Sequence, residues 1–408
     1  MSDSKVVKTQ ADQDKQFRSE TLLRPNRDRF WWRSKYDGFI GGPAWKLRAD
    51  LDVVSDQQYL REFRHGPSGF DASRREFLKE FGRDIDEIDA QNRTSTVLVM
   101  RDFENYGLAG RMDYTQNLAY WNKNNPGSRD PTVQKLPELD FFAFKHPIPG
   151  TPFEWEAQAK YDYFLRQYGT SAHRLDVKPT LSLPVQTKAL TLIPSVGVQY
   201  TQYGVTRYEN EPADTTTNKT PSRTVASAGL NLFSEASRVF DLASGELAAS
   251  KENAGKSLWT KVKHSIIPRV EYSYQSNSRR QGRLPYFNEI DRLLPRDIVT
   301  YSLTNVLDRK RSVVLAVPDA AGGQRYVSSL DYLDFMTFRL AQSFDRNEAT
   351  RTEHTDQYKR RPFSDFLAEV TFRPEKYLEL TSRSFYSPYL TRFTEHEHVL
   401  KLTREDLG

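Results

Sequence analysis

The sequence has 408 residues and no cysteine. This absence excludes a disulfide-stabilised scaffold, a cysteine zinc site and a thiol nucleophile. It leaves the cellular compartment open, because an oxidising compartment permits disulfides without requiring them. The sequence also lacks any run of about 18 or more consecutive apolar residues, which excludes a helical membrane protein.

A large excess of one charge is absent as well. Lys and Arg number 59 against 54 Asp and Glu, which gives a formal net charge of +5. Basic residues gather only in short clusters such as 309–311, with no continuous basic face, so no nucleic-acid partner is predicted. The mean hydropathy of -0.72 is polar, yet aromatic residues reach 12%, too many for a chain disordered throughout.

The N-terminal residues 1–16 are polar and lack the apolar core of a secretory signal. Taken alone, this indicates either a cytoplasmic protein or a chain whose natural start is missing. We expect residues 1–25 to form a polar segment outside the folded domain.

The strongest pattern that is present has a period of two. Trp45, Leu47, Ala49, Leu51 and Val53 occupy one parity, and Lys46, Arg48, Asp50 and Asp52 occupy the other. Successive side chains of a strand point to opposite faces, so this segment predicts a strand with one apolar and one charged face.

The same alternation recurs in two later segments. Residues 153–163 place Trp and Tyr opposite Glu, Lys and Asp, and residues 174–179 alternate Arg174, Asp176 and Lys178 with apolar neighbours. Such runs of about 10 residues match a tilted membrane strand better than the usual soluble strand of about 5 or 6.

Weaker alternation predicts roughly fifteen strands in an up-and-down meander. The further candidates lie near 29–37, 93–103, 107–120, 133–142, 188–205, 223–241, 258–276, 297–309, 330–345, 364–373, 376–386 and 397–404. One helix is predicted in a long loop at about 70–90, with apolar residues at helical spacing and a capping box formed by Ser73 and Glu76.

The apolar faces need a dry environment, and two architectures supply one. A soluble sandwich packs them together, whereas an outer-membrane barrel turns them to lipid and turns the charged faces to its lumen. The long strands, the aromatic residues near strand ends and the mixed charges favour the barrel. Prolines inside the predicted strands, such as Pro137 and Pro268, indicate local irregularity.

We therefore predict an all-β fold: an incomplete, antiparallel, up-and-down outer-membrane β-barrel of roughly 14–16 strands over residues 26–408. Its predicted lumen-facing residues are Lys46, Arg48, Asp50, Glu154, Glu156, Lys160, Asp162, Arg174, Asp176 and Lys178.

No catalytic residue, cofactor or metal is predicted. His396 and His398 would share one strand face, but no third ligand is evident. Glu154 and Glu156 also share a face, as the acid–base pair of a glycosidase does, and are interpreted as lumen charges. No phosphate-binding glycine loop or serine-elbow motif is present.

Several phrases of the sequence occur in a characteristic order. They are SDQQYLREF at 55–63, LPELDFF at 136–142, RLDVKPTLSLP at 174–184, TLIPSVGVQYTQY at 191–203, HSIIPRVEYSY at 264–274, LPYFNEIDRL at 284–293 and YSLTNVL at 301–307. This ordered set resembles the lipopolysaccharide-assembly outer-membrane proteins of the LptD (OstA, Imp) family. The resemblance is specific, because generic porins share the alternation but not the phrases.

The resemblance implies a non-enzymatic role in lipopolysaccharide (LPS) transport at the Gram-negative outer membrane. It implies an LptE-like lipoprotein plug inside the barrel, periplasmic Lpt bridge components as partners, and surrounding outer-membrane lipid. The sugars would pass through the polar lumen, and the acyl chains would leave through a seam between the first and last strands.

The chain also departs from the family pattern. It lacks the signal peptide, the periplasmic N-terminal domain, the family's cysteines and an aromatic terminal residue, and we expect it to be a fragment that does not act alone. Two alternatives stay open. One is a porin-like channel, and the other is a soluble β-rich protein that binds or hydrolyses carbohydrates.

Overall fold

A computed structural model describes residues 29–56, 58–120, 130–209, 218–278, 281–318 and 323–403. The chain forms two compact units: Met1–Leu181 with Gly197–Val225 and Ser278–Leu293, and Ser182–Val196 with Ala226–Asn277 and Leu294–Gly408. The predicted polar segment 1–25 lies outside the described residues. The single barrel domain over 26–408 stays a prediction.

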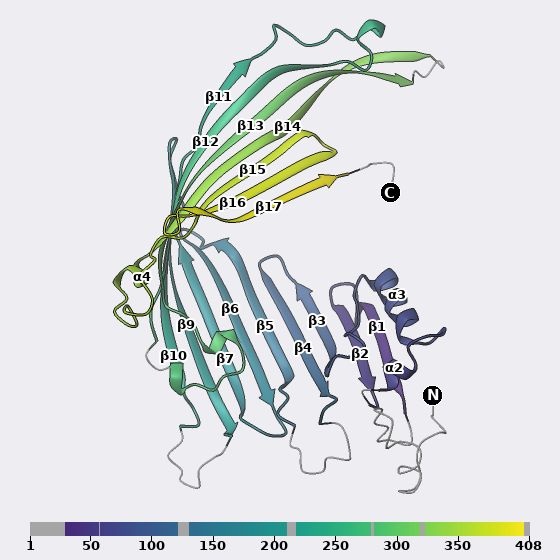
Figure 1. The fold of residues 1–408 in the computed structure, drawn as a ribbon, viewed down its shortest axis with the longest axis vertical. Helices are drawn as coiled ribbons and strands as arrows, with labels where there is room; N and C mark the ends of the chain where they lie inside the picture. The colour runs from purple at the N-terminus through teal and green to yellow at the C-terminus, as the bar shows by residue number, and fades with distance from the viewer. Residues whose placement is uncertain are drawn as a thin grey trace. The chain divides into compact units, whose positions relative to one another are not determined.

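Seventeen strands of the described residues form an antiparallel sheet (Figure 1). They are β1 Trp31–Phe39, β2 Lys46–Val54, β3 Asn92–Asp102, β4 Tyr106–Asn117, β5 Gln134–Pro147, β6 Glu154–Leu165, β7 Ser171–Ser182, β8 Val185–Gln186, β9 Thr191–Arg207, β10 Ser222–Phe233, β11 Ala236–Asp241, β12 Ser257–Gln275, β13 Arg296–Pro318, β14 Gln324–Asp345, β15 Phe366–Glu375, β16 Leu378–Ser387 and β17 Arg392–Leu402.

Chain neighbours pair as antiparallel ladders, as a meander requires. In the first unit the registers run from β1–β2 through β5–β6, and in the second they run from β12–β13 through β16–β17. The sheet that the described strands form is not closed into a barrel. The all-β antiparallel prediction is confirmed, and the open sheet is consistent with the incomplete barrel that was predicted.

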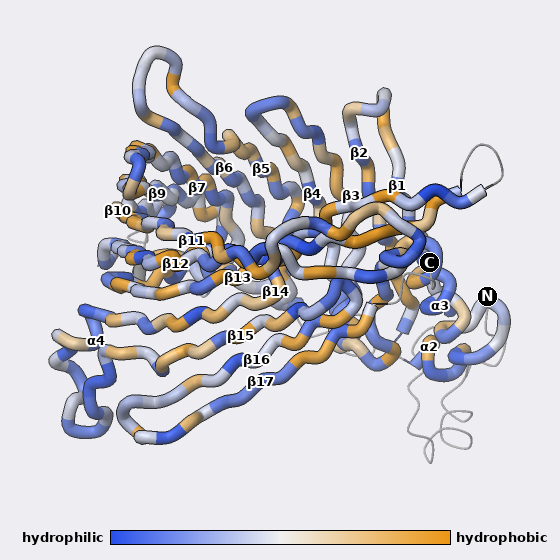
Figure 2. Tube along the Cα trace, turned by 90° about the horizontal axis from the view of Figure 1, so that it is seen from above, coloured by the Kyte–Doolittle hydropathy of each residue, from blue (hydrophilic) through white to orange (hydrophobic). Residues whose placement is uncertain are grey.

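Burial in the first unit is inverted relative to a soluble protein. Leu139 and Leu175 are 49% and 43% exposed, whereas Asp162 and Arg174 on the opposite face are both 0% exposed. Figure 2 shows the hydrophilic and hydrophobic residues alternating along the strands. A soluble sandwich would bury its apolar face and expose its charged one, so the faces are oriented as a membrane barrel requires.

The registers align the apolar positions of neighbouring strands. Ala49 pairs with Val97, which pairs with Met112 on the next strand. Leu108 pairs with Phe141, which pairs with Ala159. With these registers the apolar residues of neighbouring strands form one continuous surface. A one-residue slip in any strand would move its charged residues onto that surface.

Two prolines lie where the sheet is irregular, as predicted. Pro137 falls inside the register shift between Lys135 and Glu138 in the β5–β6 ladder. Pro268 lies in β12 at the point where the neighbouring strand changes from β10 to β11, and its carbonyl accepts from the Ser234 amide at 3.2 Å. The missing N–H of Pro268 thus falls where the partner strand is interrupted.

The connection between β2 and β3 carries α2 Tyr59–Glu62 and α3 Phe70–Phe81. Both helices lie beside β1 and β2 (Figure 1). The Trp31 and Phe70 rings stack with centroids 5.8 Å apart, and buried Val54 and Leu60 complete this small core.

The predicted short helix is present in this loop as α3, but the predicted capping box is wrong. Helix α3 begins after Gly69, so Ser73 lies inside the helix and its hydroxyl donates to the Gly69 carbonyl at 2.9 Å. The helix ends at Gly82, whose φ of +63° suits glycine. Ile85 therefore reaches the core from beyond the helix.

Strands β13 and β14 extend well past their predicted ends. Their ladder runs from Ile298–Asp345 to Pro318–Gln324 with one register shift, at Leu307/Asp308. Strands of 23 and 22 residues exceed the 9–11 residues or so that a tilted strand needs to cross a bilayer. Residues 223–241, predicted as one strand, form β10 and β11.

Helix α4 Arg346–Thr350 was not predicted. It begins the β14–β15 connection, where the Asp345 side chain accepts from the amides of Asn347 and Glu348. Among the residues that the structure describes, no helix is long and apolar enough to cross a membrane.

The β14–β15 connection should respond to acid. The Arg351 side chain donates to Glu348 at 2.7 Å and the Arg361 amide donates to it at 3.0 Å, and these bonds lower the pKa of Glu348 from 4.5 to about 2. A lowered carboxyl pKa means that this stabilisation is complete above about pH 4.5 and is lost as the pH falls toward 2.

We expect an NMR titration of the Glu348 carboxyl to give a midpoint near 2 in the native protein. Replacing Arg351 with Gln should move the midpoint toward 4.5, since the hydrogen bond that lowers the pKa of Glu348 most is removed. An unchanged midpoint in Arg351→Gln would contradict this account, and Arg346→Gln in the same helix is the control.

Candidate functional site

The residues predicted to face a lumen on β6 and β7 lie on the charged face of the first unit. Lys160 forms ion pairs with Glu138 at 2.9 Å and Asp140 at 3.5 Å, both on the adjacent β5. Asp176 accepts from Gln199 at 2.9 Å and Thr201 at 2.6 Å, both on β9. Charges on this face are thus neutralised or hydrogen-bonded across strands.

Six of the other predicted residues are more accessible to solvent. Lys46 pairs with Asp102 at 3.7 Å, Arg48 with Asp37 at 3.1 Å, and Glu154 with Lys145 at 3.1 Å. Asp50 pairs with Arg83 of the β2–β3 connection at 2.8 Å, while Glu156 and Lys178 are exposed. That all ten face a lumen stays a prediction.

Asp162 and Arg174 meet a segment from a distant part of the chain. We call residues 281–293 the strap; it includes the single turns η2 Gln281–Arg283 and η3 Glu289–Asp291. Arg174 donates to Asp162 at 2.5 Å from one side and to Asp291 of the strap at 2.7 Å from the other. All three side chains are 0% exposed.

Asp291 is the centre of this arrangement. Its carboxylate accepts from Arg174 and from the Tyr203 hydroxyl on β9, and also from the amides of Phe287 and Asn288 at 2.6 and 2.9 Å. A buried carboxylate is tolerated only when it is paired and its lone pairs are occupied, and these donors fulfil both conditions.

Two further contacts hold the strap on the strands. The Phe287 ring stacks on Phe164 of β6, with centroids 4.2 Å apart and planes at 7°. Arg223 of β10 donates to the Ile290 carbonyl at 2.5 Å and to the Thr201 hydroxyl at 3.0 Å. The strap therefore covers part of the charged face through polar and stacking contacts together.

The β2–β3 connection is tied to the same unit by a second buried cluster. Arg29 pairs with Asp56 and Glu62, each at 2.8 Å. Asp52 of β2 accepts from the Trp31 indole at 2.7 Å and from Arg93 at 2.5 Å. This connection, like the strap, contacts charged side chains of the strands.

The second unit carries a row of alternating charge across four strands. Arg339 pairs in register with Glu369, Glu369 with Arg383, and Arg383 with Glu397. Arg383 contacts Glu369 at 2.5 Å and Glu397 at 3.1 Å. The Arg383 and Glu397 side chains are still 45% and 49% exposed.

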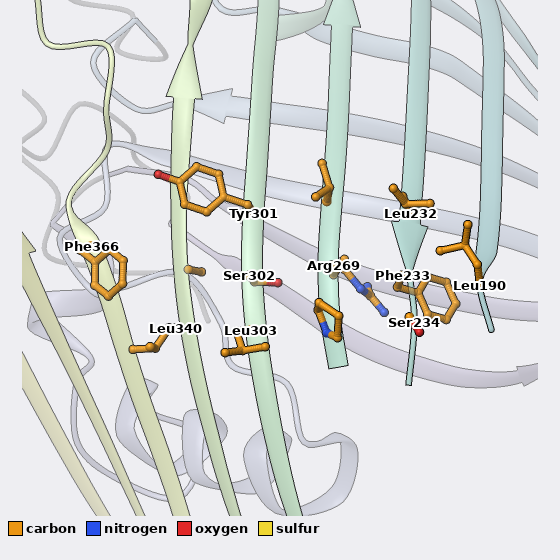
Figure 3. A pocket seen from close by; sticks show the side chains of 13 residues that line it. Leu190, Leu232, Phe233, Ser234, Arg269, Tyr301, Ser302, Leu303, Leu340 and Phe366 are labelled. Carbon is orange, nitrogen blue, oxygen red and sulfur yellow. The ribbon is translucent and has the colours of Figure 1, made fainter. Parts of the chain in front are cut away.

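The opposite face of the second unit is apolar and hollowed. A hollow of about 470 Å³ is lined by Leu232, Val270, Leu303, Leu340 and Phe366, among others. Figure 3 shows Leu303, Leu340 and Phe366 on adjacent strands, and Leu303 and Leu340 are register partners. Most of its lining is apolar, as a lipid-facing surface requires. Arg269 also lines the hollow, and its guanidinium pairs with Glu271 at 3.8 Å.

The family described as LPS transport system D matches residues 27–406, nearly the whole chain. The chain belongs to the LptD family. It is 23% identical over 377 residues to the LPS-assembly protein LptD of Bordetella pertussis, a match that covers 89% of this chain and 42% of that protein.

Proteins with the same name in Xanthomonas are also similar to this LptD-family chain. The one from Xanthomonas axonopodis pv. citri is 27% identical over 272 residues, and the one from Xanthomonas euvesicatoria pv. vesicatoria is 32% identical over 269. Each match covers 60% of this chain and 29% of the relative. The chain thus spans less than half the length of these relatives.

The phrases that carried the resemblance lie at the buried clusters of this LptD-family chain. SDQQYLREF contains Asp56 and Glu62, which bind Arg29, and LPYFNEIDRL is the strap with Asp291. RLDVKPTLSLP begins with Arg174, the residue that joins Asp162 to the strap.

Sequence reasoning missed most partners of these predicted charges. Asp291, Tyr203 and Arg223 were not singled out, although Tyr203 and Arg223 lie in predicted strands. The available signal was the strap's mixture of apolar and acidic residues between two long strands. Its docking position depends on contacts more than 80 residues apart, such as Tyr203 to Asp291 at a separation of 88.

The two histidines considered as metal ligands lie on β17. The His396 and His398 rings stack with centroids 6.2 Å apart, and the Ser384 hydroxyl is 2.9 Å from His396 Nδ1. Among the described residues, no group of three or more His, Cys, Asp or Glu is placed to hold a metal ion.

Removing the carboxylate of Asp291 should release the strap from the strands. Asp291→Ala leaves the buried Arg174 with one carboxylate, and breaking a buried pair costs about 3–5 kcal/mol. We expect trypsin to cut faster after Arg283 and Arg292 in the folded protein while the strands stay resistant. Glu289→Ala, an exposed acid of the same segment, is the control. Equal protection of the two variants would refute the role given to Asp291.

Proposed function

We propose that this chain is part of an outer-membrane β-barrel that moves LPS to the cell surface, a transport role in which no bond is made or broken. Membership of the LptD family carries the proposal, and the names of the relatives in Bordetella and Xanthomonas support it. The inverted burial of the strands supports the membrane setting.

The charged face offers a path for the polar part of LPS. Its sugars and phosphates need hydrogen-bonding and charged groups, and charged side chains cover this face of both units. Because most of these charges are paired with each other, the face presents both signs. Such a surface can hydrate a phosphorylated sugar without holding it as tightly as a purely basic surface would.

The apolar face supports contact with lipid. Exposed Leu139 and Leu175 in the first unit, and exposed Leu303 and Leu380 in the second, need an apolar environment. Backbone groups inside lipid must be hydrogen-bonded, and the continuous antiparallel ladders meet that requirement along the paired edges.

We further propose an LptE-like lipoprotein plug and periplasmic Lpt bridge components as partners. The support for a plug is the part of the charged face that stays accessible in β14–β17. Arg383 and Glu397 are nearly half exposed there, so a polar protein can bind them.

Depletion tests the transport role. In a Gram-negative cell depleted of the protein that contains this chain, surface LPS measured by antibody labelling of intact cells should fall, and re-expression should restore it. Unchanged surface LPS would contradict the proposal. If small-solute uptake fell instead, the porin-like alternative would explain the result.

A substitution pair tests which face meets lipid. Leu139→Arg puts a charge on the apolar face, and we expect it to destabilise the vesicle-embedded protein by about 2–4 kcal/mol in urea unfolding. Gln158→Arg, an exposed position on the charged face of the neighbouring strand, should have little effect. Equal effects would mean that Leu139 does not face lipid.

A further inference from the structure

The apolar face of the first unit has a hollow of its own, with a volume of about 420 Å³. It forms over β3–β7 because Gly110 has no side chain and Ala159 has a short one. Larger residues surround these positions: Val99 pairs with Gly110, and Gly110 pairs with Leu139. The hollow is therefore an elongated apolar surface.

Arg101 lies at one end of this hollow. It follows Val99 by two residues on β3, so it shares the apolar face, and its register partner Leu108 lines the hollow. The guanidinium carbon lies 4.3 Å from the Phe103 ring centre and 5.4 Å from the Trp45 ring centre. These rings hold the charge at the edge of the apolar surface.

The charge of Arg101 has no acidic partner among the ion pairs of the described residues. The adjacent Asp102 points to the other face and pairs with Lys46 at 3.7 Å. This contrasts with the charged face, where Arg174 and Lys160 have carboxylate partners within 3 Å. An arginine at the boundary of an apolar surface is stable when an anion compensates its charge.

We propose that Arg101 and this hollow bind an anionic glycerophospholipid, with the phosphate at Arg101 and an acyl chain in the hollow. The two parts of such a lipid match the two parts of the site: a guanidinium that binds phosphate oxygens and an elongated apolar surface. The inference rests on the proposed membrane setting of the chain.

The turns identify the leaflet. Arg101 precedes the β3–β4 turn at 103–105, and the β1–β2 and β5–β6 turns at the same end are also short. At the opposite end the β6–β7 turn at 166–170 is short, but the β2–β3 connection spans 55–91 and the β4–β5 connection spans 118–133. Short turns of outer-membrane barrels face the periplasm. The bound lipid is thus a phospholipid of the periplasmic leaflet, and LPS belongs to the other one.

Native mass spectrometry of the full protein in detergent, titrated with phosphatidylglycerol, tests this site. Arg101→Gln should weaken phosphatidylglycerol binding roughly fivefold, the effect expected for one basic residue near an anionic lipid. Lys46→Gln is the matched control, because this lysine lies at the same end of the neighbouring strand on the charged face. Equal losses in the two variants would overturn the proposal.

A second variant tests the hollow without changing any charge. Gly110→Val fills the hollow, and a Cβ at this position meets Leu139 Cδ2 at 3.5 Å, an ordinary contact distance. We expect weaker phosphatidylglycerol binding with unchanged thermal stability. Unchanged binding, or a preference for LPS over phosphatidylglycerol at Arg101, would overturn the proposal.

The outcomes separate this site from the transport role. If depletion lowers surface LPS but wild-type protein and Arg101→Gln bind phosphatidylglycerol equally well, the lipid site alone is contradicted. If phosphatidylglycerol binding depends on Arg101 but depletion of the protein leaves surface LPS unchanged, the transport role alone is contradicted.

Discussion

Pairing of charges between neighbouring strands is the interaction on which the rest of this fold depends. A sheet with one apolar and one charged face can turn the apolar face to lipid only if the charges behind it are compensated. Arg174 between Asp162 and Asp291, and Arg383 between Glu369 and Glu397, show the same solution in the two units. The apolar face is left free of ion pairs at these positions because the ionic contacts lie on the other side.

The sequence predicted the strands because their pattern is local. Alternation along 45–53 and 153–163 needs only the pleat of one strand to become two faces, and both segments form strands with those faces. The ends of β13 and β14 were misplaced because beyond Arg309 their residues no longer alternate in polarity. Their pairing there depends on the opposite strand.

The candidate site was predicted only in part, because only some of its residues lie in segments with a local pattern. Arg174 and Asp162 were found because they lie on alternating strands, whereas Asp291 was missed because its position depends on the docking of an irregular segment. The Ser73 cap was wrong because the helix begins earlier, after Gly69, and Ser73 binds Arg33 of β1 instead. Local rules described the strands, and tertiary contacts determined the loops.

The strap also sets an order of events in folding. Adjacent strands pair through contacts that are close in sequence, so hairpins can form early and add one strand at a time. Arg174 and Asp291 are separated by 117 residues, and the strap cannot dock until β6, β7 and β9 present their side chains. Before the strap docks, Arg174 has Asp162 as its single carboxylate partner. Formation of the Arg174–Asp291 pair is therefore a late event that reports the completion of this unit.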